Sequence, residues 1–171
     1  MEIQTAPVKK IAYLYGPLLA LVSIISTVIM YVWQLEKNVY LNTIGVILTI
    51  TIVVYGVINF KKENGNYLSI KESLKAGLAI AVIGGFISAI YTFIHYSYIQ
   101  PEFIDNLYND SMTEATKSQP NMDKDTKEMI EKMSKFITSP FILSTFSLIG
   151  TLFFGFIISL ITGAIIKKDR P

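Results

Sequence analysis

The sequence predicts an all-α polytopic membrane protein, with four transmembrane helices and an extracytoplasmic amphipathic helical hairpin between the third and the fourth. The chain is 51% hydrophobic and 16% charged, and its mean hydropathy is +0.46. A typical soluble domain has about 25% charged residues. The apolar residues are also gathered into long blocks, so we expect residues 1–171 to form a single membrane domain.

Four of these blocks are long enough to cross a bilayer, because about 30 Å of hydrocarbon requires roughly 20 apolar residues. Apart from Lys75 at one edge, they contain no Asp, Glu, Lys or Arg. A charge at the centre of a span costs about 2.5 to 3.5 kcal/mol, so this composition strongly favours insertion. The predicted spans are residues 11–33, 40–60, 74–99 and 141–166.

The first predicted span follows Lys9 and Lys10, as the apolar core of a signal peptide would. Its apolar run is too long for such a core, however, and no small-residue cleavage site follows it. We therefore expect a retained helix.

Basic residues near the span ends predict the orientation, because cytoplasmic loops carry the excess of Lys and Arg. The short turn between the first two spans contributes only Lys37. If the chain crosses four times, both termini are cytoplasmic and residues 100–140 face outward. The basic residues on the predicted cytoplasmic side are Lys9, Lys10, Lys61, Lys62, Lys71, Lys75, Lys167, Lys168 and Arg170.

The third span is preceded by NGNYLSIKESLKAG, residues 64–77. Ser69 and Glu72 have the S-x-x-E spacing of a capping box, which predicts a helix start at this point. Residues 64–66 form the turn before it, and Tyr67 and Leu68 are expected to rest on the membrane interface. A site for a cytoplasmic ligand is the alternative interpretation of this motif.

The outer segment 100–140 predicts two amphipathic helices separated by a turn at 118–121. Asp125 and Glu128 form a candidate capping pair for the second helix. Ser139 and Pro140 predict the start of the fourth span. The hairpin would lie on the bilayer, cap the bundle, or bind a partner or ligand. Apolar residues of the second helix at helical spacing are Met129, Ile130, Met133, Phe136 and Ile137.

Small residues recur every fourth position in the third and fourth spans. Since lipid supplies little hydrophobic force between helices, close backbone approach drives helix association, and such stripes predict packing faces. They would meet each other within one chain or meet a second copy in a homo-oligomer. The stripes are Gly77, Ala81, Gly85 and Ala89 in the third span, and Thr151, Gly155, Ser159 and Gly163 in the fourth.

His95, near the outer end of the third span, is the candidate functional residue. Among neighbouring tyrosines it is typical of an interfacial aromatic belt, and a pH-sensing or substrate-contacting role is the alternative. The acidic residues Asp123, Asp125 and Glu128 lack the glycine and spacing of a calcium loop. We found no catalytic set, no metal or cofactor site and no nucleic-acid-binding stripe, so the sequence does not predict an enzyme.

The order of features resembles domain-of-unknown-function family 4199, small membrane proteins chiefly of Bacteroidota. The resemblance rests on GNYLSIKESLKAG before the third span, IQPEF after it, an acidic helical loop, and TSP before a glycine-containing last span ending in Lys-Lys. It implies a location in the bacterial inner membrane and brings no catalytic residues.

Hypotheses of several classes follow. The first is a non-enzymatic accessory or scaffold protein of the cell envelope, whose partners are the lipid bilayer and a membrane or envelope protein. The second is a small transporter or channel subunit. An accessory to a membrane glycosyltransferase, which the resemblance suggests, and an enzyme acting on lipid-linked substrates are the remaining alternatives.

Overall fold

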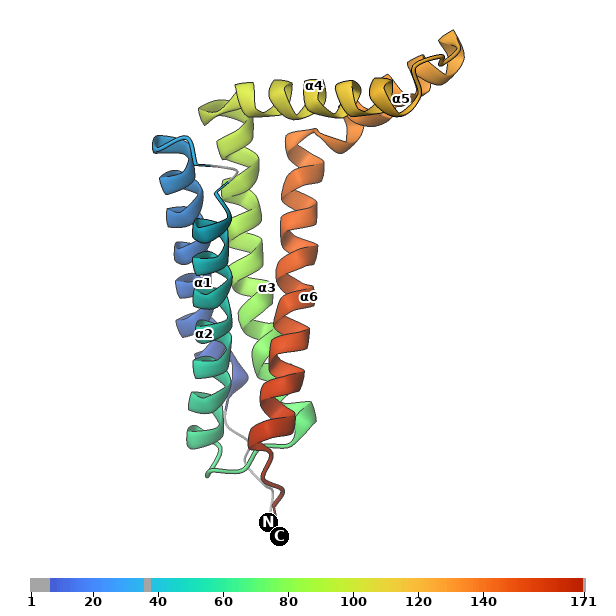
Figure 1. The fold of residues 1–171 in the computed structure, drawn as a ribbon. Coiled ribbons are helices and arrows are strands. Elements are labelled where there is room, and N and C mark those ends of the chain that lie inside the picture. Colours follow the sequence, from blue (N-terminus) through green and yellow to red (C-terminus); the bar gives the residue numbers. More distant parts are fainter. Residues whose placement is uncertain (1–6, 36–37, 171) are drawn as a thin grey trace. The chain divides into compact units, whose positions relative to one another are not determined.

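The computed structural model describes residues 7–35 and 38–170. It is 86% helical, and this described part contains six α-helices, one π-helical segment and no strand (Figure 1). Lys37, in the predicted turn between the first two spans, lies outside the described residues. The helices are α1 (Val8–Val32), α2 (Val39–Glu63), α3 (Ile70–Ile94), α4 (Pro101–Ser118), α5 (Lys124–Ile137) and α6 (Pro140–Ile166), and the π-helix η1 covers His95–Ile99.

The described part confirms the four predicted apolar spans: α1, α2, α3 with η1, and α6 are each long and apolar enough to cross a membrane. At one end, α1, α2 and α3 each extend past the apolar block into charged residues. Hydropathy falls at the first charge, whereas helical hydrogen bonding continues to the next cap. Asn38 caps α2 by accepting from the Leu41 N–H at 3.1 Å, and α2 continues to Glu63.

The predicted capping box starts α3. Glu72 Oε2 accepts from the Ser69 N–H at 2.8 Å, and Ser69 Oγ accepts from the Glu72 N–H at 3.2 Å. The helix therefore begins at Ile70, four residues before the predicted span. Gly65 and Asn66 adopt positive φ angles of 69° and 65°, so the preceding turn uses residue types that tolerate the left-handed region.

The chain divides into two compact units, Met1–Ser88 with Leu148–Pro171 and Ala89–Ser147. The first unit holds α1, α2 and most of α3 and α6. Its core combines residues from all four helices and the loop before α3, which makes it a helical bundle. The buried hydrophobic residues of this core are Ile11, Leu19, Val53, Val57, Phe60, Leu68, Ala76, Ile80 and Ile158.

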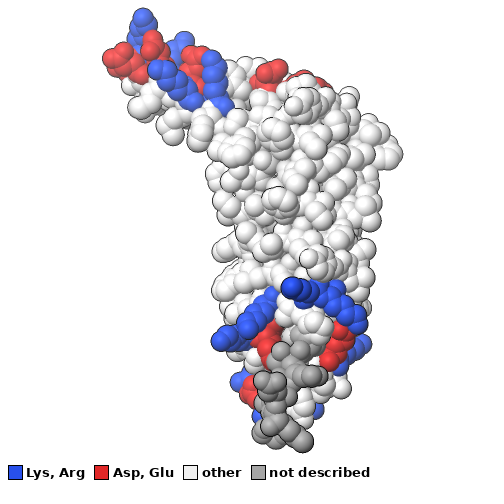
Figure 2. All heavy atoms as spheres, turned by 180° about the vertical axis from the view of Figure 1, so that it is seen from behind, with Lys and Arg blue, Asp and Glu red and all other residues white. Residues whose placement is uncertain are grey.

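One end of the first unit, which we call the basic end, joins four chain segments. Lys10 of α1 forms an ion pair with Glu63 of α2 at 2.7 Å. Lys61 of α2 donates to the Ile166 carbonyl at the end of α6, at 2.6 Å. Lys and Arg side chains gather at this end (Figure 2).

Leu68 and Lys168 exchange two backbone hydrogen bonds of 2.9 Å at the basic end. Leu68 is fully buried there, rather than resting on an interface as the sequence predicted. The partner segment consists of the residues that follow α6, and no local sequence pattern before α3 predicts this pairing.

The second unit contains η1, the α4–α5 pair and the adjoining ends of α3 and α6. The helical hairpin predicted over 100–140 is confirmed, with α4 beginning at Pro101 and α6 at Pro140. The predicted capping pair of α5 was wrong. The N-cap is Asp123, whose Oδ1 accepts from the Thr126 N–H at 3.3 Å, whereas Asp125 already lies in the first helical turn.

Candidate functional site

The small-residue stripes of α3 and α6 face each other in the first unit. Each step of four residues along α3 is matched by a step of four residues back along α6, as expected for antiparallel helices whose i, i+4 positions share a face. The small side chains let the two backbones come close. The facing pairs are Ser73 with Gly163, Gly77 with Ser159, Ala81 with Gly155, and Gly85 with Thr151.

Three glycines at this contact, Gly77, Gly155 and Gly163, leave no room for a side chain. A Cβ added to Gly163 would lie 2.7 Å from the Ser73 Cβ, and one added to Gly77 would meet the Ser159 Cβ at a still shorter distance. Such close approach is what allows dispersion forces to hold two helices together in lipid. Ala89, the last member of the predicted stripe, is half-buried and belongs to the second unit.

An interhelical hydrogen bond adds to the α3–α6 contact. The buried Ser73 hydroxyl donates to the Ser159 carbonyl at 2.6 Å. The Ser159 hydroxyl instead donates within its own helix, to the Gly155 carbonyl at 2.7 Å. Ser73 was not predicted from the sequence as part of this contact, although it lies four residues before Gly77 and extends the same stripe.

A second close contact, between α1 and α3, was likewise not predicted from the sequence. A Cβ added to Gly84 would lie 2.7 Å from the Gly16 carbonyl oxygen, and one added to Gly16 would lie 2.7 Å from the Ile83 Cβ. Gly16 lies between Ala12 and Ala20 in a four-residue series of small residues, all three buried, which was an available signal for a packing face on α1. The adjacent pair Gly84–Gly85 was a second signal, because two neighbouring glycines allow α3 to approach different helices on two faces.

A cluster of polar side chains occupies the basic end. The Asn64 amide donates to Glu72 Oε1 at 3.2 Å, and Arg170 donates to Asn64 Oδ1 at 2.8 Å. Arg170 also lies 3.8 Å from Glu72 Oε1. This cluster ties the turn before α3 to the segment after α6, so the N-G-N-Y-L-S motif has structural contacts for its polar groups.

His95 is fully buried in the second unit, at the first position of η1. Its Nε2 lies 3.2 Å from Gln100 Oε1, and its Nδ1 lies 3.2 Å from the Tyr91 hydroxyl. Since an amide oxygen only accepts, we assign the proton to Nε2, so that Tyr91 donates to Nδ1. Both ring nitrogens are therefore engaged within the unit, as buried polar groups generally are.

The π-helical turn around His95 has a local cause. The Gln100 N–H donates to the His95 carbonyl at 2.8 Å, a five-residue bond that brings the Gln100 side chain back toward the ring. Pro101 follows, and a residue before proline is disfavoured in the α conformation. Gln100 accordingly leaves the helix, with φ of −133° and ψ of 58°.

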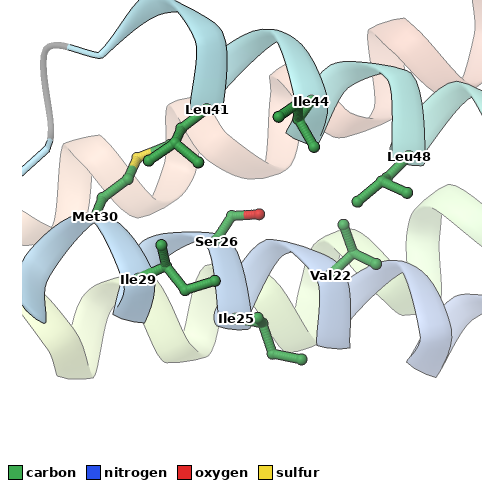
Figure 3. A pocket seen from close by; sticks show the side chains of 8 residues that line it. All are labelled: Val22, Ile25, Ser26, Ile29, Met30, Leu41, Ile44 and Leu48. Atoms are coloured by element: carbon green, nitrogen blue, oxygen red, sulfur yellow. The ribbon is translucent and has the colours of Figure 1, made fainter. Parts of the chain in front are cut away.

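Two apolar grooves lie between helices of the first unit. One, about 220 Å³ in volume, separates the C-terminal half of α1 from the start of α2, and Ser26 supplies a hydroxyl to an otherwise apolar lining (Figure 3). The other, about 400 Å³, runs between α2 and α6. A shallow polar hollow between α4 and α5 contains Lys117 and Lys127. Throughout residues 7–35 and 38–170, no three His, Cys, Asp or Glu side chains are arranged to hold a metal ion.

Four long apolar helices, with close small-residue contacts between them, define a multi-pass membrane protein. The chain belongs to the family described as "Protein of unknown function (DUF4199)", whose family model matches residues 14–168. Comparisons with curated proteins and with solved structures returned no match.

Proposed function

We propose that this chain is a non-enzymatic accessory or scaffold protein of the bacterial inner membrane. In this proposal both termini are cytoplasmic, and the α4–α5 hairpin faces outward and binds another membrane or envelope protein. The polar groups described above support a structural use of the chain, because the buried Ser73 and His95 and the partly buried Glu72 each bond to neighbours inside it.

The observation that carries the proposal is an exposed apolar stripe on α5. Met129, Met133, Phe136 and Ile137 follow helical spacing, and Met133 and Phe136 are 56% and 65% exposed. A row of this kind on a helix that is otherwise charged is typical of a surface that docks into an apolar groove. Methionine adapts well to such contacts because its side chain is flexible and polarizable.

The charged side of α5 is already engaged within the second unit. Lys135 forms an ion pair with Glu131 at 2.7 Å, and its ammonium lies 5.8 Å from the centre of the Tyr108 ring of α4. Lys135 of this side thus contacts α4, whereas Met133 and Phe136 are exposed, so the apolar stripe is available to another molecule.

Photo-crosslinking tests this proposal in cells. A photoreactive amino acid in place of Met133 is expected to give an adduct with one defined protein, whereas the same group in place of Glu128, on the charged face, is not. The same protein should co-purify with the native chain and be lost from the Met133→Ser, Phe136→Ser double variant.

Three results would contradict the proposal. Adducts with lipid alone would show that the stripe lies on the bilayer. Adducts with a second copy of the chain would make it a homo-oligomer contact. Equal protein adducts from Met133 and Glu128 would show that the stripe is not the binding face.

A further inference from the structure

The groove between α2 and α6 is apolar along its length. From α2 it is lined by Ile50, Val54 and Ile58, which lie on one face at four-residue intervals. The lining from α6 includes Ile161 and Ile165, both exposed. Thr162 also lines it, but its hydroxyl donates to the Ile158 carbonyl at 2.7 Å and is thereby engaged within α6.

The groove ends at two lysines. Lys62 extends the α2 row of lining residues by one turn beyond Ile58, because it follows that residue by four on the same helix. Lys61 lies beside it and donates to the carbonyl of Ile166, a residue of the groove lining, at 2.6 Å. An ammonium has three donors, so this bond leaves two for another acceptor.

The positive charge at this mouth is not cancelled by the adjacent acid. Glu63 follows the two lysines in the sequence, but its carboxylate pairs with Lys10 of α1 at 2.7 Å. Lys61 is bonded to a neutral carbonyl, and Lys62 is exposed. The groove therefore joins an apolar trough to an electropositive mouth, which is the charge pattern of sites for anionic lipid headgroups.

The length of the groove matches one leaflet of a bilayer. Ile50 and Lys62 are twelve residues apart on α2, which corresponds to about 18 Å of helix. Half of a hydrocarbon core of about 30 Å is about 15 Å. A volume of about 400 Å³ lies within the usual range of ligand sites, roughly 300 to 1,000 Å³.

We infer that the α2–α6 groove is a binding site for an anionic glycerophospholipid. One acyl chain lies against the isoleucine-lined walls, and the headgroup phosphate accepts hydrogen bonds from Lys61 and Lys62. The inference is independent of the role proposed for α5, which belongs to the other unit.

Thermal unfolding of the purified, delipidated protein in mild detergent tests this inference. Phosphatidylglycerol is expected to raise the unfolding midpoint more than phosphatidylcholine with the same acyl chains, because a ligand that binds the folded state stabilises it. The Lys61→Gln, Lys62→Gln double variant should lose most of this difference. Lys124→Gln, Lys127→Gln, which removes the same charge from α5, should keep it.

Photolabelling measures lipid binding to the groove directly, in addition to the unfolding midpoints. Phosphatidylglycerol with a photoreactive acyl chain is expected to label α2 and α6 of the native protein at the groove residues, and excess unlabelled phosphatidylglycerol should suppress the labelling. This readout does not depend on the folding of any variant.

The inference is overturned if the two lipids stabilise the native protein equally, or if the α2 variant and the α5 variant respond alike. If inorganic phosphate alone stabilises the protein as much as phosphatidylglycerol does, the lysines bind an anion and the groove binds no acyl chain. Labelling spread evenly over α1, α2 and α6 would show that the lipid is ordinary annular lipid. If a photoreactive amino acid in place of Ile161 links two copies of the chain, a second copy fills the groove.

Discussion

Gly77 and Gly150 show how the same residue type has opposite uses in this fold. Gly77 is pressed against Ser159, whereas a Cβ added to Gly150 would meet nothing within 4 Å. Glycine in the interior of a helix is less favourable than alanine by roughly 0.5 to 1 kcal/mol. At Gly77 the close approach of two helices offsets that cost, and at Gly150 the described contacts provide no such compensation.

Alanine substitutions at these two positions are expected to change stability in opposite directions. Gly77→Ala should lower the free energy of unfolding by about 1 to 3 kcal/mol, because the added methyl forces α3 and α6 apart. Gly150→Ala should raise it slightly through helix propensity. Thermal unfolding of both variants in one detergent checks this, and equal destabilisation would contradict the α3–α6 contact described above.

The hydroxyls of Ser73 and Ser159 also differ in their contribution to the stability of the α3–α6 contact. Ser73→Ala removes a hydrogen bond between helices, and such bonds are worth about 0.6 kcal/mol on average in membrane bundles. Ser159→Ala leaves that bond intact, since Ser73 donates to the backbone carbonyl of Ser159. We therefore expect the Ser73 variant to have the lower unfolding midpoint, and the reverse order would contradict the interhelical bond.

At the scale of single elements, helix starts were more predictable than helix partners. Ser69 with Glu72 and Ser139 with Pro140 carry local signals that need no information from distant residues, and both helices begin where expected. Asp123 was missed because Asp125, two positions later, is an equally suitable N-cap residue type. Only the backbone conformation distinguishes them: Asp123 is extended, as an N-cap residue is, whereas Asp125 is already helical.

The start of α5 is expected to weaken in acid. Hydrogen bonds from Thr126 hold the pKa of Asp123 below its ordinary value, and the hydrogen bond from Lys135 does the same for the pKa of Glu131. A carboxylate with a lowered pKa in the folded state contributes stability above its unfolded pKa of about 4. That contribution disappears as the pH falls through the folded pKa.

Hydrogen exchange measures this effect. After correction for intrinsic exchange rates, the amide protection of α5 should fall as the pH decreases below about 5. The Asp123→Asn, Glu131→Gln variant keeps a capping side chain but removes both titrating groups, so its protection should depend less on pH. An unchanged pH dependence in the variant would show that other groups are responsible.

At the scale of the whole molecule, the bilayer explains why the four spans were predictable from composition. A backbone in lipid must satisfy its own hydrogen bonds, so a long apolar block has few alternatives to a helix. The contacts between spans were less predictable. A four-residue stripe identifies a face of α3, but whether that face meets α6 or another chain depends on residues far away, such as Leu68 and Lys168.

The predicted orientation can be measured because the chain contains no cysteine. Ser118→Cys, at the end of α4, is expected to react with a membrane-impermeant maleimide on intact spheroplasts. Asp169→Cys, beyond α6, should react only after the membrane is permeabilised. Both positions are exposed in the structure, so the difference reports sidedness, and the opposite labelling would reverse the orientation derived from the basic residues.

The repeating contact between α3 and α6 has a further consequence for alignment. A shift of α6 by four residues, about 5.4 to 6 Å along the helix, would again place small residues against small residues, with Gly77 opposite Gly155 or Gly163. The stripe alone therefore admits several nearly equivalent alignments. The Leu68–Lys168 backbone pair and the Lys61 bond to Ile166 hold one end of α6 at a fixed height. The short segment after the last helix thus selects a single alignment for a helix pair whose interface is periodic.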